Sequence, residues 1–112
     1  MKIAIPLAQE KLCAHFGHCE KFALLEVDEQ KCSIVSRTDV LPPPHEPGVL
    51  PQWLAEKEVK VIISGGMGQR AQQLFASKNI QVIVGAPTDT PEALAIEYVK
   101  GNLKAGANLC DH

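Results

Sequence analysis

The chain has 112 residues, 46% of them hydrophobic, and a formal net charge of −2, which suits one compact domain that needs no disulfides for stability. Lysine and arginine are scattered along the sequence, so it has neither a basic stripe for nucleic acid nor a polybasic run for anionic lipid. The apolar start becomes polar over residues 8–10, too early for a signal peptide. No apolar run approaches the roughly 20 residues of a membrane span, so we expect a cytoplasmic protein.

Three β-like runs open the sequence. The first covers residues 2–7, and the next two, 22–27 and 32–40, are separated by a polar turn at residues 28–31. This pattern predicts a hairpin that lies beside the first strand. The stretch from Leu41 to Gly48 contains four prolines, which lack an N–H donor and fix their own φ angles, so it is expected to be a connection.

Helical and β-branched segments alternate in the second half. Leu50, Trp53 and Leu54 have helical spacing, and the run at residues 59–63 is typical of a buried strand. A glycine turn at residues 64–68 leads into a second helix and then a strand at 80–84, which predicts a βαβ unit with parallel strands. Thr90 is a good N-cap for a last helix, and Gly101 is expected to end it.

Taken in order, these elements predict a β-β-β-α-β-α-β-α arrangement. We expect a single α/β domain over residues 1–101, with a mixed five-stranded sheet flanked by helices. Residues 102–112 carry little apolar surface and are expected to form a flexible tail. Ligands of such sheets usually bind beyond the carboxyl ends of the parallel strands, where the glycine turn after Ile63 is expected and which a loop after the first strand can reach.

The densest group of reactive side chains lies in that loop. Cys13, His15, His18 and Cys19 fall within seven residues, together with the permissive Gly17. Thiolate and imidazole are ligands of copper(I), zinc and iron–sulfur clusters rather than of magnesium or calcium. The pattern indicates a metal or cluster site. The alternative is that the cysteines are small buried apolar residues and the histidines hydrogen-bond the loop.

Other cysteines and histidines offer further ligands. Cys110 and His112 form a second C-x-H pair, and the two pairs together allow a tetrahedral zinc or copper(I) site, although their spacing matches no common zinc module. His45 lies in the proline-rich connection, from which it can complete a site from a second loop. Cys32 falls in an expected strand, where packing is the simpler role.

The run from Gly66 to Ala71 formally matches a dinucleotide-binding fingerprint. The acidic residue expected about 20 residues later is absent from residues 84–87, so we reject that interpretation. The N–H groups of Gly65, Gly66 and Gly68 and the helix dipole still favour an anionic ligand, with Arg70 nearby. An anionic metal–sulfur cluster fits this turn; the alternative is a tight turn that simply requires glycine.

Signs of catalysis are weaker. No serine stands in a nucleophile-elbow pattern, and no acidic pair ends the strands as two-metal hydrolysis requires. A redox or hydrolytic enzyme built on Cys13 or Cys19 needs a lowered thiol pKa. We therefore expect a protein that is not an enzyme, and an interaction module without a ligand is a further alternative.

Several motifs resemble, in order and spacing, the dinitrogenase iron–molybdenum cofactor biosynthesis family, which includes NifX/NifB-type domains. They are residues 1–6, the His15-Phe16-Gly17 motif followed by Phe22, His45 with Gly48, and residues 65–71. The resemblance extends over almost the whole chain. It implies a ribonuclease H-like fold and a role in binding, storing or delivering iron–molybdenum cofactor or its precursors.

The resemblance also implies a site and a partner. The family includes the orange protein, which carries a molybdenum–copper sulfide cluster. The histidine of the His-Phe-Gly motif, here His15, is implied as a cluster contact beside the turn from Gly65 to Gly68, and a metalloprotein that donates or receives the cofactor is the implied partner. Cys13, His18 and Cys19 depart from many members of the family, and their thiolates favour a copper or iron–sulfur cluster.

Overall fold

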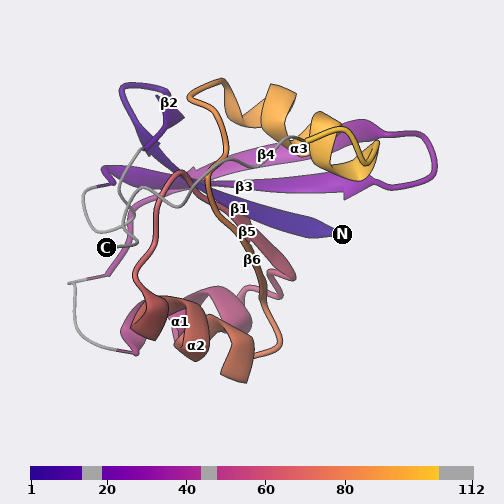
Figure 1. Ribbon diagram of the computed structural model, residues 1–112. Coiled ribbons are helices and arrows are strands. Elements are labelled where there is room, and N and C mark those ends of the chain that lie inside the picture. The colour runs from indigo at the N-terminus through magenta and orange to yellow at the C-terminus, as the bar shows by residue number, and fades with distance from the viewer. Residues whose placement is uncertain (14–18, 44–47, 104–112) are drawn as a thin grey trace.

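A computed structural model of the protein describes residues 1–13, 19–43 and 48–103 (Figure 1). Its strands and helices follow one another in the order predicted from the sequence, with one addition. They are β1 (Lys2–Ala8), β2 (Lys11–Leu12), β3 (Lys21–Asp28), β4 (Ser33–Val40), α1 (Val49–Glu56), β5 (Val61–Ile63), α2 (Gln69–Ser77), β6 (Gln81–Ile83) and α3 (Pro91–Val99).

The strands form one mixed sheet in the order β4-β3-β1-β5-β6. The β3–β4 hairpin is antiparallel and lies beside β1, whereas β1, β5 and β6 are parallel to one another. These directions confirm the predicted mixed sheet. The predicted count of five strands is too low, because the short β2 pairs with the end of β1 and gives a sheet of six within the described residues. A two-residue strand is too short to show an alternating pattern in sequence.

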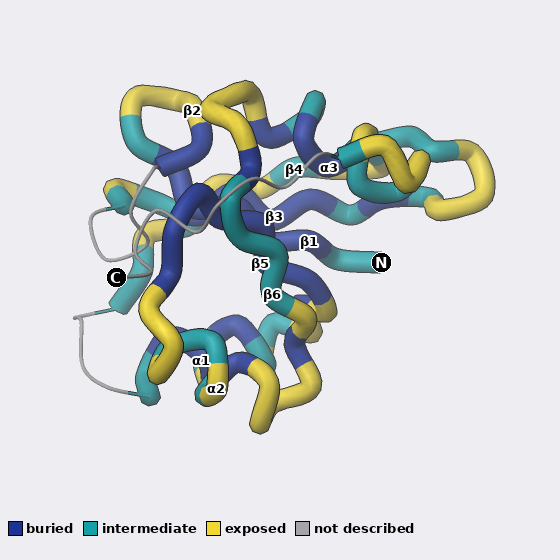
Figure 2. The backbone as a smooth tube through the Cα atoms, viewed as in Figure 1, coloured by how far each residue is buried: buried dark blue, intermediate teal, exposed yellow. Residues whose placement is uncertain are grey.

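Helices cover both faces of the sheet, as the two helical layers of Figure 1 show. On the face covered by α1 and α2, one core contains Ala4 and Phe22 from the sheet and Leu54 and Phe75 from the helices. On the other face, Ile3, Ile5 and Leu7 of β1 pack with residues of α3. Alternate residues of β1 therefore enter opposite cores, and β1 and β5 form the buried centre of the fold (Figure 2).

The expected helix ends are also present. Thr90 Oγ1 accepts a hydrogen bond from the Ala93 N–H at 3.4 Å, Pro91 begins α3, and Gly101 follows it with a φ of +77°. Cys32 differs from the prediction, because it precedes β4 in a turn with a φ of +51° and its Sγ contacts the Glu29 carbonyl at 3.7 Å. The turn between β3 and β4 therefore covers residues 29–32, one residue later in the chain than predicted.

In the described part of the chain, none of the helices has the length and apolar character needed to cross a membrane.

Candidate metal and cofactor site

The sheet opens between β1 and β5 at Pro6. The two strands pair in parallel at Ile3 and Ala4, but Pro6 has no N–H with which to continue that ladder. Its carbonyl instead accepts a hydrogen bond of 2.9 Å from the N–H of Cys13, the residue directly after β2. The chain at Cys13 therefore takes the place beside β1 that β5 leaves when it turns away.

The second cysteine lies on the other side of β1. The Glu20 N–H donates to the Leu7 carbonyl at 2.8 Å, which places Cys19 just before β3 at the same end of β1. Cys19 packs against the core beneath α1 and α2. Leu12, the last residue of β2, lies in the opposite core, and Cys13 follows it directly.

The two thiols are close enough to affect each other electrically. Cys13 is buried and Cys19 is half-buried, and neither is in a disulfide. Burial, and after it the neighbouring Cys13, raise the pKa of the Cys19 thiol to about 11. Cys19 is therefore protonated at neutral pH, and a metal that bound its Sγ would have to displace that proton.

The glycine turn lies beyond β5 at the same carboxyl end of the sheet. Ser64 is completely buried, its N–H donates to the Ile83 carbonyl at 2.8 Å, and its Oγ donates to the Gly66 carbonyl at 3.0 Å. The Gly85 N–H, at a φ of +75°, donates to the Gly65 carbonyl at 3.0 Å. Gly65 and Gly66 are buried, so the start of the turn is held firmly against the end of β6.

The turn then exposes the start of α2. Gly68 is the N-cap residue, is exposed, and provides no side-chain cap for the helix. The Gln72 side chain donates to the Met67 carbonyl at 2.8 Å and fixes the last step of the turn. Arg70 is exposed and, within the described residues, makes no ion pair. The uncapped N–H groups and this cation favour a negatively charged ligand.

These features meet at one edge because β1, β5 and β6 are parallel. The helix after β5 covers one face and the helix after β6 covers the other, so their connections diverge at the carboxyl end, which is where ligands bind in open α/β sheets. Two neighbouring thiols fit a soft or borderline metal. Within the described residues, no group of three or more histidine, cysteine or acidic side chains gathers as a complete metal site.

Several predicted ligands lie outside the described residues. They are His15, His18 and His45, together with Cys110 and His112 of the expected tail. Pro6, Ser64 and Gln72 also shape the site through the backbone, and the ligand-like sequence patterns do not include them. The proline within a strand and the serine before the glycines were visible signals, whereas the contact of Gln72 with the turn was not.

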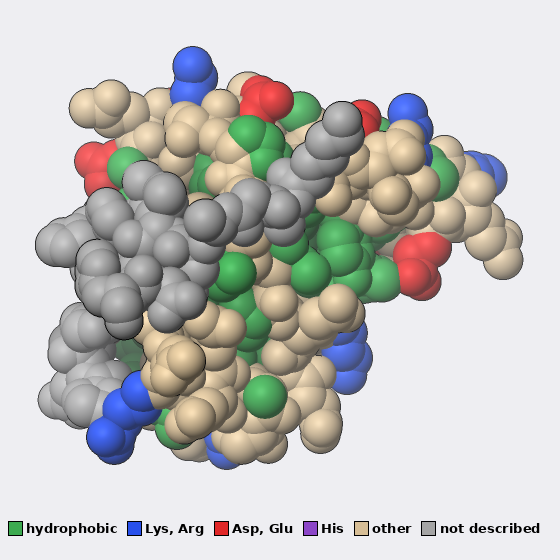
Figure 3. All heavy atoms as spheres, viewed as in Figure 1, with side chains coloured by type: hydrophobic (Ala, Val, Ile, Leu, Met, Phe, Trp, Pro, Cys, Tyr) green, Lys and Arg blue, Asp and Glu red, His purple; other side chains and the backbone are tan. Residues whose placement is uncertain are grey.

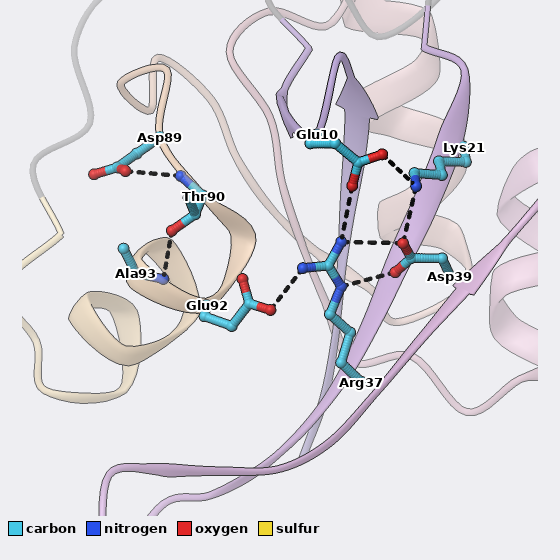
Figure 4. A network of polar contacts seen from close by, with 8 residues as sticks. All are labelled: Glu10, Lys21, Arg37, Asp39, Asp89, Thr90, Glu92 and Ala93. Atoms are coloured by element: carbon cyan, nitrogen blue, oxygen red, sulfur yellow. Dashed lines mark hydrogen bonds and ion pairs between the residues drawn. The ribbon is translucent and has the colours of Figure 1, made fainter.

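A network of charged side chains lies beside the ends of the cysteine loop (Figure 4). The Arg37 guanidinium on β4 binds Asp39 through two contacts of 2.8 and 3.0 Å and binds Glu92 on α3 at 2.6 Å. Lys21 Nζ lies 3.0 Å from Asp39 and 2.8 Å from Glu10 of the β1–β2 turn. The network therefore connects the turn, both hairpin strands and α3. On the face shown in Figure 3, charged side chains of both signs are dispersed.

Comparison with known proteins gives matches over nearly the full length. A family model described as dinitrogenase iron-molybdenum cofactor matches residues 1–101. An uncharacterized protein of Methanocaldococcus jannaschii is 30% identical over 107 residues, which cover 93% of this chain and 90% of that protein.

Solved structures share the fold. The crystal structure of PH0822 has a TM-score of 0.83 at 24% identity and covers 95% of this chain and 96% of its own. The apo form of the orange protein from Desulfovibrio gigas has a TM-score of 0.73 at 20% identity, covering 96% of this chain and 93% of its own. At these identities the structural matches establish the shared architecture.

Proposed function

Because the chain belongs to the dinitrogenase iron-molybdenum cofactor family, we propose that it binds and carries a metal–sulfur cofactor and is not itself an enzyme. The observation that carries this proposal is the placement of the Cys13 and Cys19 thiols and the glycine turn at one carboxyl edge of the sheet. A soft-metal ligand pair beside uncapped backbone N–H groups suits an anionic metal–sulfide cargo.

Each part of the site has a proposed role. Cys13 and Cys19 bind the metal, and His15, His18 and His45 are the imidazole ligands that the sequence offers in addition. The N–H groups of Gly65, Gly66 and Gly68, together with Arg70, offset the negative charge of the bound group. The cargo supplies its own metal and sulfide chemistry, while the protein holds it and controls its access to water.

The cargo is an iron–molybdenum, iron–sulfur or molybdenum–copper cluster. Thiolates at Cys13 and Cys19 favour the copper and iron–sulfur types. We propose a metalloprotein that donates or receives this cofactor as the partner, and a cytoplasmic location, where reducing conditions keep both cysteines as thiols. The fold is proposed to be ribonuclease H-like, which the order and directions of the five longer strands support.

Reconstitution tests the proposal. The purified protein is treated with iron and sulfide, or with molybdate, copper and sulfide, and desalted; bound metal and visible absorption are then measured. Wild type is expected to retain a coloured cluster, and a Cys13→Ser/Cys19→Ser variant to lose most of it. Cys32→Ser is the matched control, because Cys32 is also half-buried but lies in the β3–β4 turn. Equal metal retention by wild type and the double variant would overturn the proposal.

A further inference from the structure

The turn between β1 and β2 is strained. Gln9 and Glu10 have φ angles of +55° and +67°, the left-handed region that two-residue hairpin turns usually fill with asparagine and glycine. Such residues persist only where the surrounding structure holds them, and they cluster at functional sites. The contacts that hold these two residues in the left-handed region therefore indicate the role of the turn.

Both turn residues are held by the chain that follows the cysteine loop. The Gln9 N–H donates to Glu20 Oε1 at 2.7 Å, and Lys21 Nζ binds Glu10 Oε1 at 2.8 Å. Arg37 Nη2 lies 3.8 Å from the other oxygen of Glu10. The contacts run from the segment just before Cys13 to the segment just after Cys19, so they close the loop at its base.

These contacts act on the thiols through short, rigid connections. Two residues separate Glu10 from Cys13, and Cys13 is itself bound to β1 through the Pro6 carbonyl. Glu20 follows Cys19 directly and is bound to β1 through the Leu7 carbonyl. Lys21 and Arg37 are in turn fixed by Asp39, and Arg37 by Glu92 of α3 (Figure 4). The base of the loop is thus anchored to the sheet and to a helix.

We propose that Glu10, Glu20 and Lys21 are positioning residues that hold Cys13 and Cys19 at the separation a shared metal requires. This inference rests on the proposed metal-binding function and adds the residues that preorganise it. Glu10 and Glu20 act through the backbone rather than as metal ligands. Within the described residues, no group of potential ligands combines either carboxylate with both thiols. Groups that support a metal site from outside its ligand set typically change metal affinity by about 10 to 100-fold.

The test uses cobalt(II) as the probe, because cobalt–thiolate bonds give a charge-transfer absorption. Affinity is measured by titration against a competing chelator, and folding by circular dichroism and urea unfolding. Glu10→Gln and Lys21→Gln break the same ion pair but change the net charge in opposite directions. Both are expected to weaken cobalt binding about tenfold. Glu20→Met, which removes the acceptor of the Gln9 N–H, is expected to do the same, with folded spectra retained.

Two controls remove matched charges elsewhere. Glu56→Gln on α1 and Lys31→Gln in the β3–β4 turn both alter exposed side chains and are expected to bind cobalt like wild type. If local charge alone governed affinity, Lys21→Gln would bind cobalt more tightly than wild type, which would overturn the positioning role. Wild-type affinity in all three variants, at Glu10, Glu20 and Lys21, would overturn it as well. A wild type without any thiolate charge-transfer band would instead contradict the proposed function itself.

Discussion

Ser64 offers a direct test of how the glycine turn is held. Its side chain is completely buried and donates a hydrogen bond of 3.0 Å to the Gly66 carbonyl. Ser64→Ala removes this donor and leaves the Gly66 carbonyl in a buried turn without it. Leaving a buried acceptor unsatisfied costs about 1 to 3 kcal/mol. For a domain of this size, that corresponds to a fall in Tm of about 4 to 12 °C.

Ser77 provides the matched control. Its Oγ donates to the Leu74 carbonyl at 2.7 Å, but the residue is exposed at the end of α2, where water can replace the lost donor. Ser77→Ala is therefore expected to change the free energy of unfolding by less than about 0.5 kcal/mol. The difference in unfolding free energy between Ser64→Ala and Ser77→Ala separates the effect of burial from that of losing a hydroxyl.

Urea unfolding and thermal melts of both variants supply the measurement. A Ser64→Ala protein as stable as Ser77→Ala would refute the view that the serine hydroxyl pins the turn. Because Gly65 and Gly66 belong to the proposed site, Ser64→Ala is also expected to weaken retention of a reconstituted cluster while Ser77→Ala leaves it unchanged.

Two further predictions concern pH. The Arg37 guanidinium lowers the pKa of both Asp39 and Glu92, so their ion pairs stabilise the fold at neutral pH, and this stability is lost as pH falls below about 4 and through the lowered pKa values. In urea unfolding, Arg37→Met should therefore lose up to about 1 kcal/mol less free energy of unfolding than wild type between pH 7 and pH 3. Parallel curves of unfolding free energy against pH for the two proteins would contradict this. Burial raises the pKa of Cys19 to about 11, so loss of the Cys19 proton alone should make cobalt affinity rise about tenfold per pH unit between pH 6 and 8. Cys19→Ser should lower that slope. A cobalt affinity of wild type that does not change with pH would count against Cys19 as a ligand.

Most of the architecture could be predicted from local sequence patterns. The β-branched run at residues 59–63 and the alternation around the polar turn near Asp28 predict strands because burial on one or two faces leaves those patterns. Thr90, Pro91 and Gly101 mark the ends of α3 because caps depend on the chemistry of single residues. Each of these signals is contained within about ten residues of chain.

The parts that sequence did not reveal depend on contacts between distant segments. Arg37 and Glu92 are 55 residues apart, and their ion pair exists only because α3 packs against the β3–β4 hairpin. The proximity of Cys13 and Cys19 also depends on the register of β1 with β2 and β3, which no local pattern reveals. The loop composition predicted a metal site, but not the contacts of Glu10, Glu20 and Lys21 at the base of the loop.

Pro6 links a local sequence signal to contacts between distant segments. In the sequence it stands near the end of an apolar run and could be taken as the end of the strand, yet β1 continues to Ala8 because Pro6 keeps its pairing with Phe22 of β3. Only the other edge of β1 is affected, since that is where the missing N–H would have bonded β5. There the Pro6 carbonyl binds Cys13 while β5 turns into the glycine segment. The same proline therefore separates β5 from β1 and places a cysteine at the opening, so the ligand-rich loop and the glycine turn share one edge of the sheet.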